Sequence, residues 1–172
     1  QAQFEKPIVT KSENLQDSEV VEDEKVKLNC KVFSQLIVAE KQEPGFVGNT
    51  IYVKYIKDVD SLTKAKYCDE LKIGSLIKLD ASSLIFWGAK QKYAFLKDAD
   101  ELSARTKFEI YNTETGIKTY SGVRNNDHSF KIIPITTSKL ALEYFQRFLS
   151  QCPFNNKDKI KNCWKNFLKE IQ

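Results

Sequence analysis

The sequence of 172 residues contains no methionine, one histidine, six glycines and four prolines. It has neither of the glycine-rich loops that cradle phosphates in nucleotide-binding folds, Gly-x-x-x-x-Gly-Lys-Ser/Thr and Gly-x-Gly-x-x-Gly. The single histidine, His128, and the lack of a Cys-x-x-Cys pair argue against a tetrahedral metal site. No metal and no cofactor are therefore expected.

Long apolar runs are absent as well. The longest, at 36–39 and 84–87, have four residues each, whereas a membrane-spanning helix needs ~18 or more. At the same time, 41% of the residues are hydrophobic and 29% are charged, which excludes a chain that is disordered throughout. We expect one globular domain at 25–172 without a transmembrane segment, since a chain of this length can bury a sizeable core.

Arginine is rare, with 3 residues against 24 lysines. Because bidentate recognition of guanine and phosphate favours arginine, nucleic acid is not an expected partner. The net charge at pH 7 is only +4, but residues 1–24 hold seven acidic side chains and two lysines. This polar segment predicts a flexible acidic N-terminal arm at 1–24.

The chain begins Gln1-Ala2-Gln3, and a removed signal peptide would explain both this start and the missing initiator methionine. The alternative is a trimmed chain in which internal methionine is absent by chance. We expect an exported protein, either secreted or periplasmic.

Four cysteines, Cys30, Cys68, Cys152 and Cys163, are an even number, as expected for two disulfides in an oxidising compartment. Cys152 and Cys163 lie near the facing ends of two expected helices and would join them across a short loop. Cys30 and Cys68 would then pair across the β-rich region. The alternative is four buried thiols that pack as small hydrophobic side chains.

Residues 25–136 show the alternation of half-buried strands, most clearly where Val26, Leu28, Cys30 and Val32 are separated by polar residues. Two hairpins are expected, one with its loop at 88–91 and one at 113–116, where Gly116 ends the turn. A short helix is expected at 61–71. About seven short strands joined by tight turns predict an antiparallel, barrel-like sheet of the OB or SH3 kind.

The period changes to that of a helix at 137–172. Leu142, Phe145, Leu149 and Cys152 recur every three or four residues after a capping Thr137 or Ser138. A second helix is predicted by the apolar stripe of Ile160, Cys163, Trp164, Phe167, Leu168 and Ile171. The predicted fold class is therefore α+β, with the β-rich part at 25–136 and a C-terminal two-helix hairpin at 137–172 packed on the sheet.

No catalytic residue is identified. His128 would serve as a general base for a Cys68 nucleophile only if that thiol were free, and an exported Cys68 is expected to be oxidised. A surface histidine in a turn is the favoured interpretation. Paired carboxylates of a hydrolase leave no sequence pattern, because the tertiary structure sets their separation.

Aromatic residues make up 12% of the chain, and most are expected to pack in the β-rich core. Phe86 and Trp87 are the exception, because an expected hairpin tip leaves large side chains hard to bury. They are the predicted partner contact. The sequence favours a secreted or periplasmic protein-binding module, such as an inhibitor, an immunity-type protein or an envelope-assembly component. The alternative is a small secreted hydrolase of glycan or peptide with carboxylate catalysis, and the oligomeric state stays open.

Overall fold

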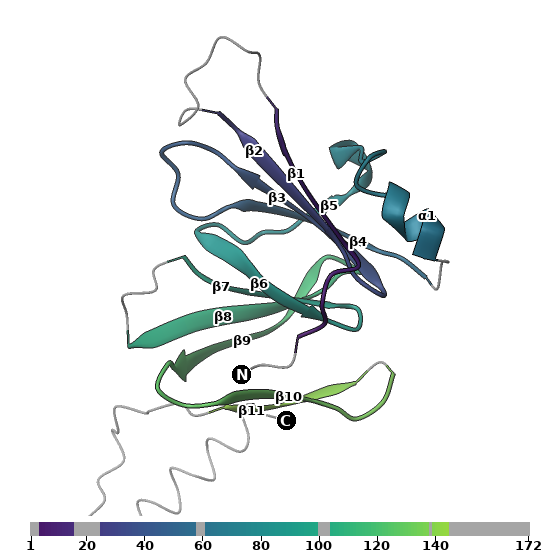
Figure 1. The fold of residues 1–172 in the computed structure, drawn as a ribbon. Coiled ribbons are helices and arrows are strands. Elements are labelled where there is room, and N and C mark those ends of the chain that lie inside the picture. Colours follow the sequence, from purple (N-terminus) through teal and green to yellow (C-terminus); the bar gives the residue numbers. More distant parts are fainter. Residues whose placement is uncertain (1–3, 16–24, 58–60, 100–103, 138, 145–172) are drawn as a thin grey trace, which may run out of the picture.

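Short antiparallel strands make up most of the described chain. The computed structural model describes residues 4–15, 25–57, 61–99, 104–137 and 139–144. In these ranges eleven strands form three sheets, in which each strand pairs antiparallel with its neighbour in sequence (Figure 1). The first sheet contains β1 (Val9–Asn14), β2 (Lys27–Val32), β3 (Leu36–Gln42), β4 (Thr50–Tyr55) and β5 (Ile77–Lys78). The second contains β6 (Leu84–Lys90), β7 (Tyr93–Asp98), β8 (Arg105–Asn112) and β9 (Ile117–Asn125).

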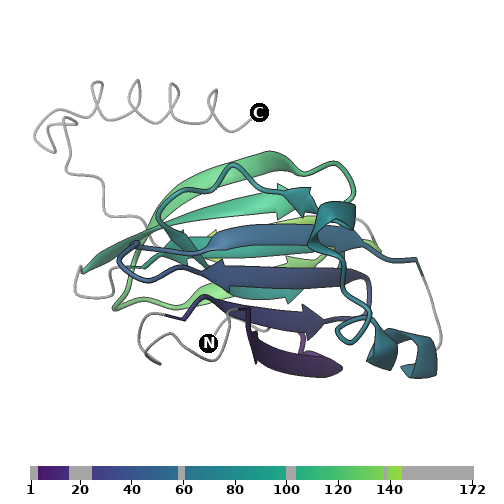
Figure 2. The ribbon, with the colours of Figure 1, turned by 90° about the horizontal axis from the view of Figure 1, so that it is seen from above.

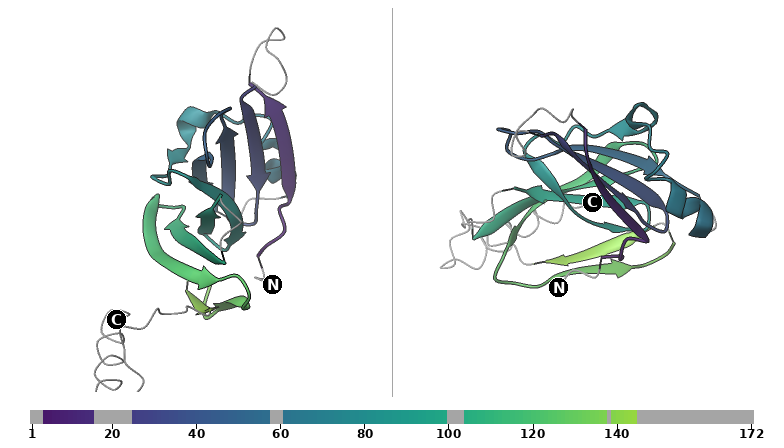
Figure 3. Two further views of the ribbon diagram at one scale, coloured as in Figure 1. Left: turned by 90° about the vertical axis from the view of Figure 1, so that its left-hand side faces the viewer. Right: turned by 45° about the horizontal axis from the view of Figure 1, so that its top comes forward.

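The remaining elements cover the outer faces of these two sheets. The hairpin of β10 (Phe130–Pro134) and β11 (Leu140–Tyr144) forms the third sheet and lies against the β6–β9 sheet (Figures 1 and 3). Helix α1 (Ser61–Lys66) and the short 3₁₀ helix η2 (Ile73–Ser75) connect β4 to β5. Residues 61–71, here called the α1 segment, lie beside the β1–β5 sheet (Figure 2). The described chain is thus layered as α1 segment, β1–β5 sheet, β6–β9 sheet and hairpin.

Three apolar clusters fill the spaces between these layers. The central cluster lies between the two larger sheets and includes Leu36, Val38, Leu84 and Leu96. A second cluster packs under the α1 segment. The third, which we call the aromatic cluster, lies between the β6–β9 sheet and the hairpin, and its buried members are Phe95, Phe108, Ile110, Phe130 and Ile132. Because layers cover both faces of the two large sheets, β3, β7 and β8 bury consecutive residues, which point to opposite sides of their sheet.

The unbroken apolar run at 36–39 follows from this double burial. Leu36 and Val38 on β3 face the central cluster, whereas Ile37 faces the α1 segment. All three side chains are at most 1% exposed. A strand with one solvent-exposed face would have polar residues at alternate positions. The apolar run is therefore explained by the layers that cover both faces of this sheet.

The predicted α+β class with a barrel-like sheet is wrong. The described strands do not close into one barrel: β1 and β5 are the edges of one sheet, and β6 and β9 are the edges of the next. The sequence pattern of strands that are apolar on both faces suits a barrel packed against helices as well as it suits stacked sheets. Which strands share a sheet is decided by long-range pairing, which local periodicity does not encode.

The predicted C-terminal two-helix hairpin is also not found in the described chain. Where its first helix was expected to begin, β11 pairs with β10 in the register Phe130↔Tyr144, and Leu140, Leu142 and Tyr144 face the aromatic cluster. Every second residue of β11 therefore faces the sheet, in place of the every third or fourth residue expected for a helix around Leu142. The strand forms because the hairpin covers apolar side chains of β7 and β8. The rest of both predicted helices, at 145–172 and including Cys152 and Cys163, lies outside the described residues.

Two local predictions are corrected at the N-terminal arm and at the first hairpin. Within the expected arm, β1 pairs with β2 in the register Val9↔Val32, so this part belongs to the first sheet. The expected loop at 88–91 is shorter, because β6 extends to Lys90 and only two residues separate it from β7. The second hairpin is confirmed: residues 113–116 connect β8 and β9, and Gly116 has φ +72°.

Candidate functional site

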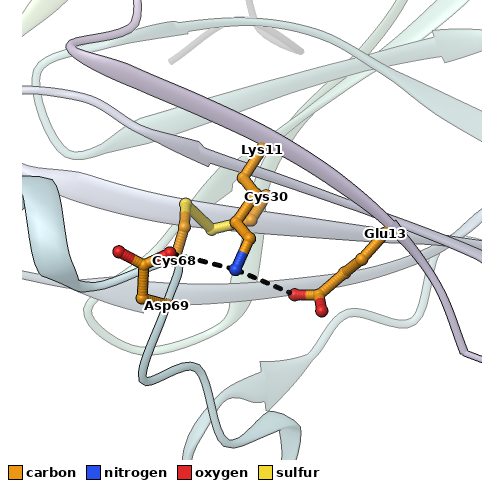
Figure 4. The surroundings of a disulfide bond; sticks show 5 residues. All are labelled: Lys11, Glu13, Cys30, Cys68 and Asp69. Atoms are coloured by element: carbon orange, nitrogen blue, oxygen red, sulfur yellow. Dashed lines mark hydrogen bonds and ion pairs between the residues drawn. A yellow bond between two sulfur atoms is a disulfide. The ribbon is translucent and has the colours of Figure 1, made fainter.

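The predicted disulfide between Cys30 and Cys68 is confirmed. Their sulfur atoms lie 2.07 Å apart, and the bond joins β2 to the segment after α1 (Figure 4). Both cysteines are buried, and Lys11 at the surface beside them bonds the carboxylate of Asp69 at 3.0 Å. The disulfide fastens the α1 segment to the first sheet, and it removes Cys68 as a nucleophile for His128.

Phe86 and Trp87, the predicted contact pair, lie within β6 and face opposite sides of the β6–β9 sheet. The pairing of β6 with β7 shifts between Phe86 and Gly88, which marks a β-bulge. Phe86 packs on the central cluster, with its ring 5.7 Å from that of Phe33, whereas Trp87 packs on the aromatic cluster. The two side chains are half-buried and do not form one surface patch. Their contact with a partner stays a prediction.

Trp87 lines an open concavity of about 460 Å³ beside the aromatic cluster. Its aromatic part is formed by three rings: the Trp87 ring centroid lies 5.1 Å from that of Phe4 and 4.7 Å from that of Phe130. These rings come from the N-terminal segment, β6 and β10, so the fold brings together distant parts of the chain. The other residues that line the concavity are polar: Arg124, Asn126, His128 and Ser129.

Arg124, near the end of β9, is the one arginine or lysine among the described residues that line this concavity. Its guanidinium carbon lies 4.9 Å from the centroid of the Trp87 ring and 6.0 Å from that of Phe130, which is cation–π geometry. The Nε atom is buried and has no hydrogen-bond partner among the residues that the structure describes, and burial lowers the pKa of the guanidinium. Among the ion pairs between described residues, none involves Arg124. The side chain therefore holds a partly desolvated positive charge that no described carboxylate neutralises.

The buried carboxylates of the described chain have partners of their own. Burial alone would raise the pKa of Glu109, but hydrogen bonds from Tyr111, Lys107 and Lys118 outweigh it and hold the pKa below its usual value. Its Oε1 lies 2.9 Å from Lys107 Nζ and 3.2 Å from Lys118 Nζ. An ionised carboxylate held between lysines suits a structural ion pair better than the general acid of a hydrolase.

Glu40, the other buried acid, accepts hydrogen bonds from Lys31 at 3.0 Å and from Asn49 at 2.9 Å. Neither Glu40 nor Glu109 lines the concavity. The described residues also contain no group of three or more His, Cys, Asp or Glu side chains that could hold a metal ion. Nothing in this part of the chain favours the hydrolase alternative.

Sequence reasoning identified Trp87 and singled out His128 as a turn histidine, but it missed Arg124 and Phe4 as parts of the same site. Phe4 lies in the segment assigned to a mobile arm, and its contact with Trp87 depends on β1 joining the first sheet. Arg124 is one of only three arginines in the chain, and this rarity is the only sequence signal that could have drawn attention to it.

No protein-family model, curated protein or solved structure matches this chain. Its own fold therefore defines its class: a disulfide-linked protein of stacked antiparallel sheets with an aromatic, arginine-containing concavity. Within the described residues, no helix has the length and apolar character needed to cross a bilayer.

Proposed function

We propose that this chain is a protein-binding module of a secreted or periplasmic protein, and that the concavity around Trp87 and Arg124 belongs to its contact surface. An inhibitor, an immunity-type protein and an envelope-assembly component would all act through such a surface. The observation that carries the proposal is the cation–π contact, at an open site, between half-buried Trp87 and an arginine with no ion pair to any described carboxylate. Tryptophan and arginine are among the residues that contribute most to binding at protein interfaces.

The energetics of Arg124 support a contact role. A guanidinium that is partly removed from water, with aromatic rings but no described carboxylate beside it, has lost hydration that the cation–π contacts replace only in part. A partner that supplied an anion or a hydrogen-bond acceptor there would recover that loss. The arrangement therefore favours the bound state of the protein over its free state.

The openness of the concavity favours a protein over a small molecule as the partner. Sites for small molecules usually enclose most of the ligand surface, whereas this concavity is partly open to solvent. A protein partner covers such a site by contacts around its edges. The Cys30–Cys68 disulfide agrees with an oxidising compartment, in which an exported partner would be met.

Affinity capture with the full chain as bait, from the culture fluid and envelope of its source, tests the proposal. Trp87→Ala removes the central ring, and Ser129→Trp fills the concavity from an exposed position without removing a packed side chain. Ile117→Ala is the matched control, because Ile117 is 64% exposed at the other end of β9. Unfolding curves of all variants show whether each one is folded.

We expect a stoichiometric protein partner that wild type and Ile117→Ala retain and that Trp87→Ala and Ser129→Trp lose. Losing a tryptophan hot spot costs ~2 kcal/mol or more, which corresponds to a roughly 30-fold weaker affinity. Two results would overturn the proposal: capture of no stoichiometric protein, or equal retention of the partner by Ser129→Trp and wild type.

A further inference from the structure

We infer that the group bound beside Arg124 is a carboxylate of the partner protein, carried next to an apolar side chain that contacts the aromatic rings. This inference rests on the proposed function, because it names the chemistry that the same concavity recognises. The carboxylate belongs either to an acidic side chain or to the end of a polypeptide. These two sources share one chemistry, and the experiment below separates them.

The first argument is the contrast between Arg124 and three described lysines that pair with buried acids. Lys31, Lys107 and Lys118 all lie within ion-pair distance of a buried glutamate, between 2.9 and 3.2 Å. Arg124 has aromatic rings beside it instead. A guanidinium stays charged in proteins, so its charge calls for an external anion.

The second argument is the charge of the described lining. Among the described residues that line the concavity there is an arginine but no aspartate or glutamate, so this part of the lining attracts an anion. The charge of Arg124 therefore suits an anion.

The third argument is the aromatic surface beside the guanidinium, which selects among anions. The guanidinium carbon of Arg124 lies 4.9 Å from the centroid of the Trp87 ring, and the planar fork of a guanidinium matches the two oxygens of a carboxylate. Phe4, Trp87 and Phe130 supply an apolar surface within reach of the same opening. A carboxylate attached to an apolar side chain uses both features, whereas an isolated inorganic anion uses only one.

Titration of the full chain with short peptides tests the inference directly. One probe carries an internal acid, acetyl-Ala-Phe-Glu-Ala-amide, and its uncharged match has glutamine in place of glutamate. The other carries a terminal carboxylate, acetyl-Ala-Ala-Phe, and its match is the C-terminal amide. Binding is followed in ¹H–¹⁵N spectra through the side-chain N–H resonance of Arg124, which is assigned by its loss in Arg124→Lys.

At least one acidic peptide is expected to shift the Arg124 resonance and to bind about tenfold or more tightly than its uncharged match. Arg124→Gln should abolish this preference. Lys131→Gln, which removes a positive charge from an exposed position on β10, should preserve it. The peptide that binds more tightly identifies the source as a side chain or a chain end. Equal binding of acidic and uncharged peptides overturns the inference, and so does the absence of any shift at peptide concentrations up to roughly 10 mM.

Failure of this inference differs visibly from failure of the proposed function. If a captured partner is lost with Ser129→Trp but binds Arg124→Gln as tightly as wild type, the protein contact stands and the carboxylate is wrong. If acidic peptides bind but no protein is captured, carboxylate recognition stands and the protein-binding proposal is wrong. Inorganic phosphate serves as a further probe, and tighter binding of phosphate than of either peptide also overturns the inference.

Discussion

The ring of Phe4 occupies the space that a side chain at position 88 would need. A Cβ atom on Gly88 would lie 2.3 Å from Cγ of Phe4, far closer than carbon atoms approach without a shift of the structure. With no side chain at position 88, Phe4 packs edge-on against both Trp87 and Phe95, at centroid distances of 5.1 and 5.2 Å. The glycine thus allows the N-terminal segment to reach the concavity.

The residue after Phe4 holds this segment in place with three hydrogen bonds. The backbone N–H of Glu5 donates to the carbonyl oxygen of Ala89 at 2.9 Å. Its carboxylate accepts from the Ser34 hydroxyl at 2.6 Å and from the Gln91 backbone N–H at 2.8 Å. Because Ser34 lies between β2 and β3 and Gln91 follows β6, Glu5 links the two larger sheets.

Substituting Gly88→Ala is expected to displace the Phe4 ring and to lower the free energy of unfolding by about 1–3 kcal/mol. In a Phe4→Ala background the same change should cost much less, because the ring it would strike is gone. Urea unfolding of the four proteins gives the coupling energy directly. Gly74→Ala is the control, since nothing lies within 4 Å of its added Cβ. Additive effects of the Phe4 and Gly88 changes would contradict this account.

Removing the disulfide with the double substitution Cys30→Ala and Cys68→Ala is expected to lower the free energy of unfolding by about 4 kcal/mol. The bond closes a loop over a sequence separation of 38 residues, and the figure follows from the loop entropy that the unfolded chain regains. Equilibrium urea unfolding measures it. Lys11→Gln removes the neighbouring ion pair with Asp69 at the surface and should leave the midpoint close to that of wild type. A similar midpoint for the double variant and wild type would show that the bond does not constrain the unfolded chain.

Glu109→Gln is expected to lower the free energy of unfolding at pH 7 by about 1–2 kcal/mol, because the lysines beside it lose a buried charged partner. The pKa of Glu109 in the folded protein lies below its usual value of 4.5. Its ionised form therefore contributes stability above pH 4.5, and this contribution is lost as the pH falls through the folded-state pKa. Urea unfolding between pH 7 and pH 3 should show the difference between wild type and Glu109→Gln shrinking below pH 4.5. A difference that stays constant or grows on acidification would rule out this linkage.

Truncating side chains on the two opposite faces of β10 is expected to change the free energy of unfolding by very different amounts. Phe130 is 1% exposed and contacts the rings of Trp87, Phe95, Phe108 and Tyr144, so Phe130→Ala should cost about 3–5 kcal/mol. Ile133, which is 45% exposed on the same strand, should cost under about 0.5 kcal/mol when changed to alanine. Thermal or urea unfolding measures both. Comparable losses would mean that the hairpin does not cover the β6–β9 sheet through the Phe130 face.

Local features of the fold were predictable where neighbouring residues alone decide them. The alternation of Leu28, Cys30 and Val32 marks β2, and the residues ending at Gly116 form the turn between β8 and β9. Helix α1 begins at Ser61, where a helix was expected, but it ends at Lys66, before the predicted end at 71. The Cys30–Cys68 bond was reached from the even number of cysteines and their expected surroundings, and its pairing is correct.

The candidate site was only partly predictable, because its members are distant in sequence. Trp87 was identified as an aromatic residue that is hard to bury, but the reason was mistaken, since it lies inside β6 and not at a turn. Its orientation depends on the bulge that separates it from Phe86. Phe4 reaches it only because β1 joins the first sheet, and Arg124 reaches it only because β9 is long enough to carry that side chain to the concavity.

The sequence by itself determined that this chain builds antiparallel strands and where one of its tight turns falls, and its four cysteines indicated disulfides while leaving three pairings open. These features depend on side-chain alternation, backbone preferences and cysteine number, all of which are readable along the chain. Only the tertiary structure decided that the strands divide into stacked sheets, that Leu140–Tyr144 is a strand, and that Phe4, Trp87 and Arg124 meet. The sequence of a strand that is apolar on both faces indicates that both faces are buried, but it does not indicate which segments bury them. The choice among coverings is made by packing between segments far apart in the sequence.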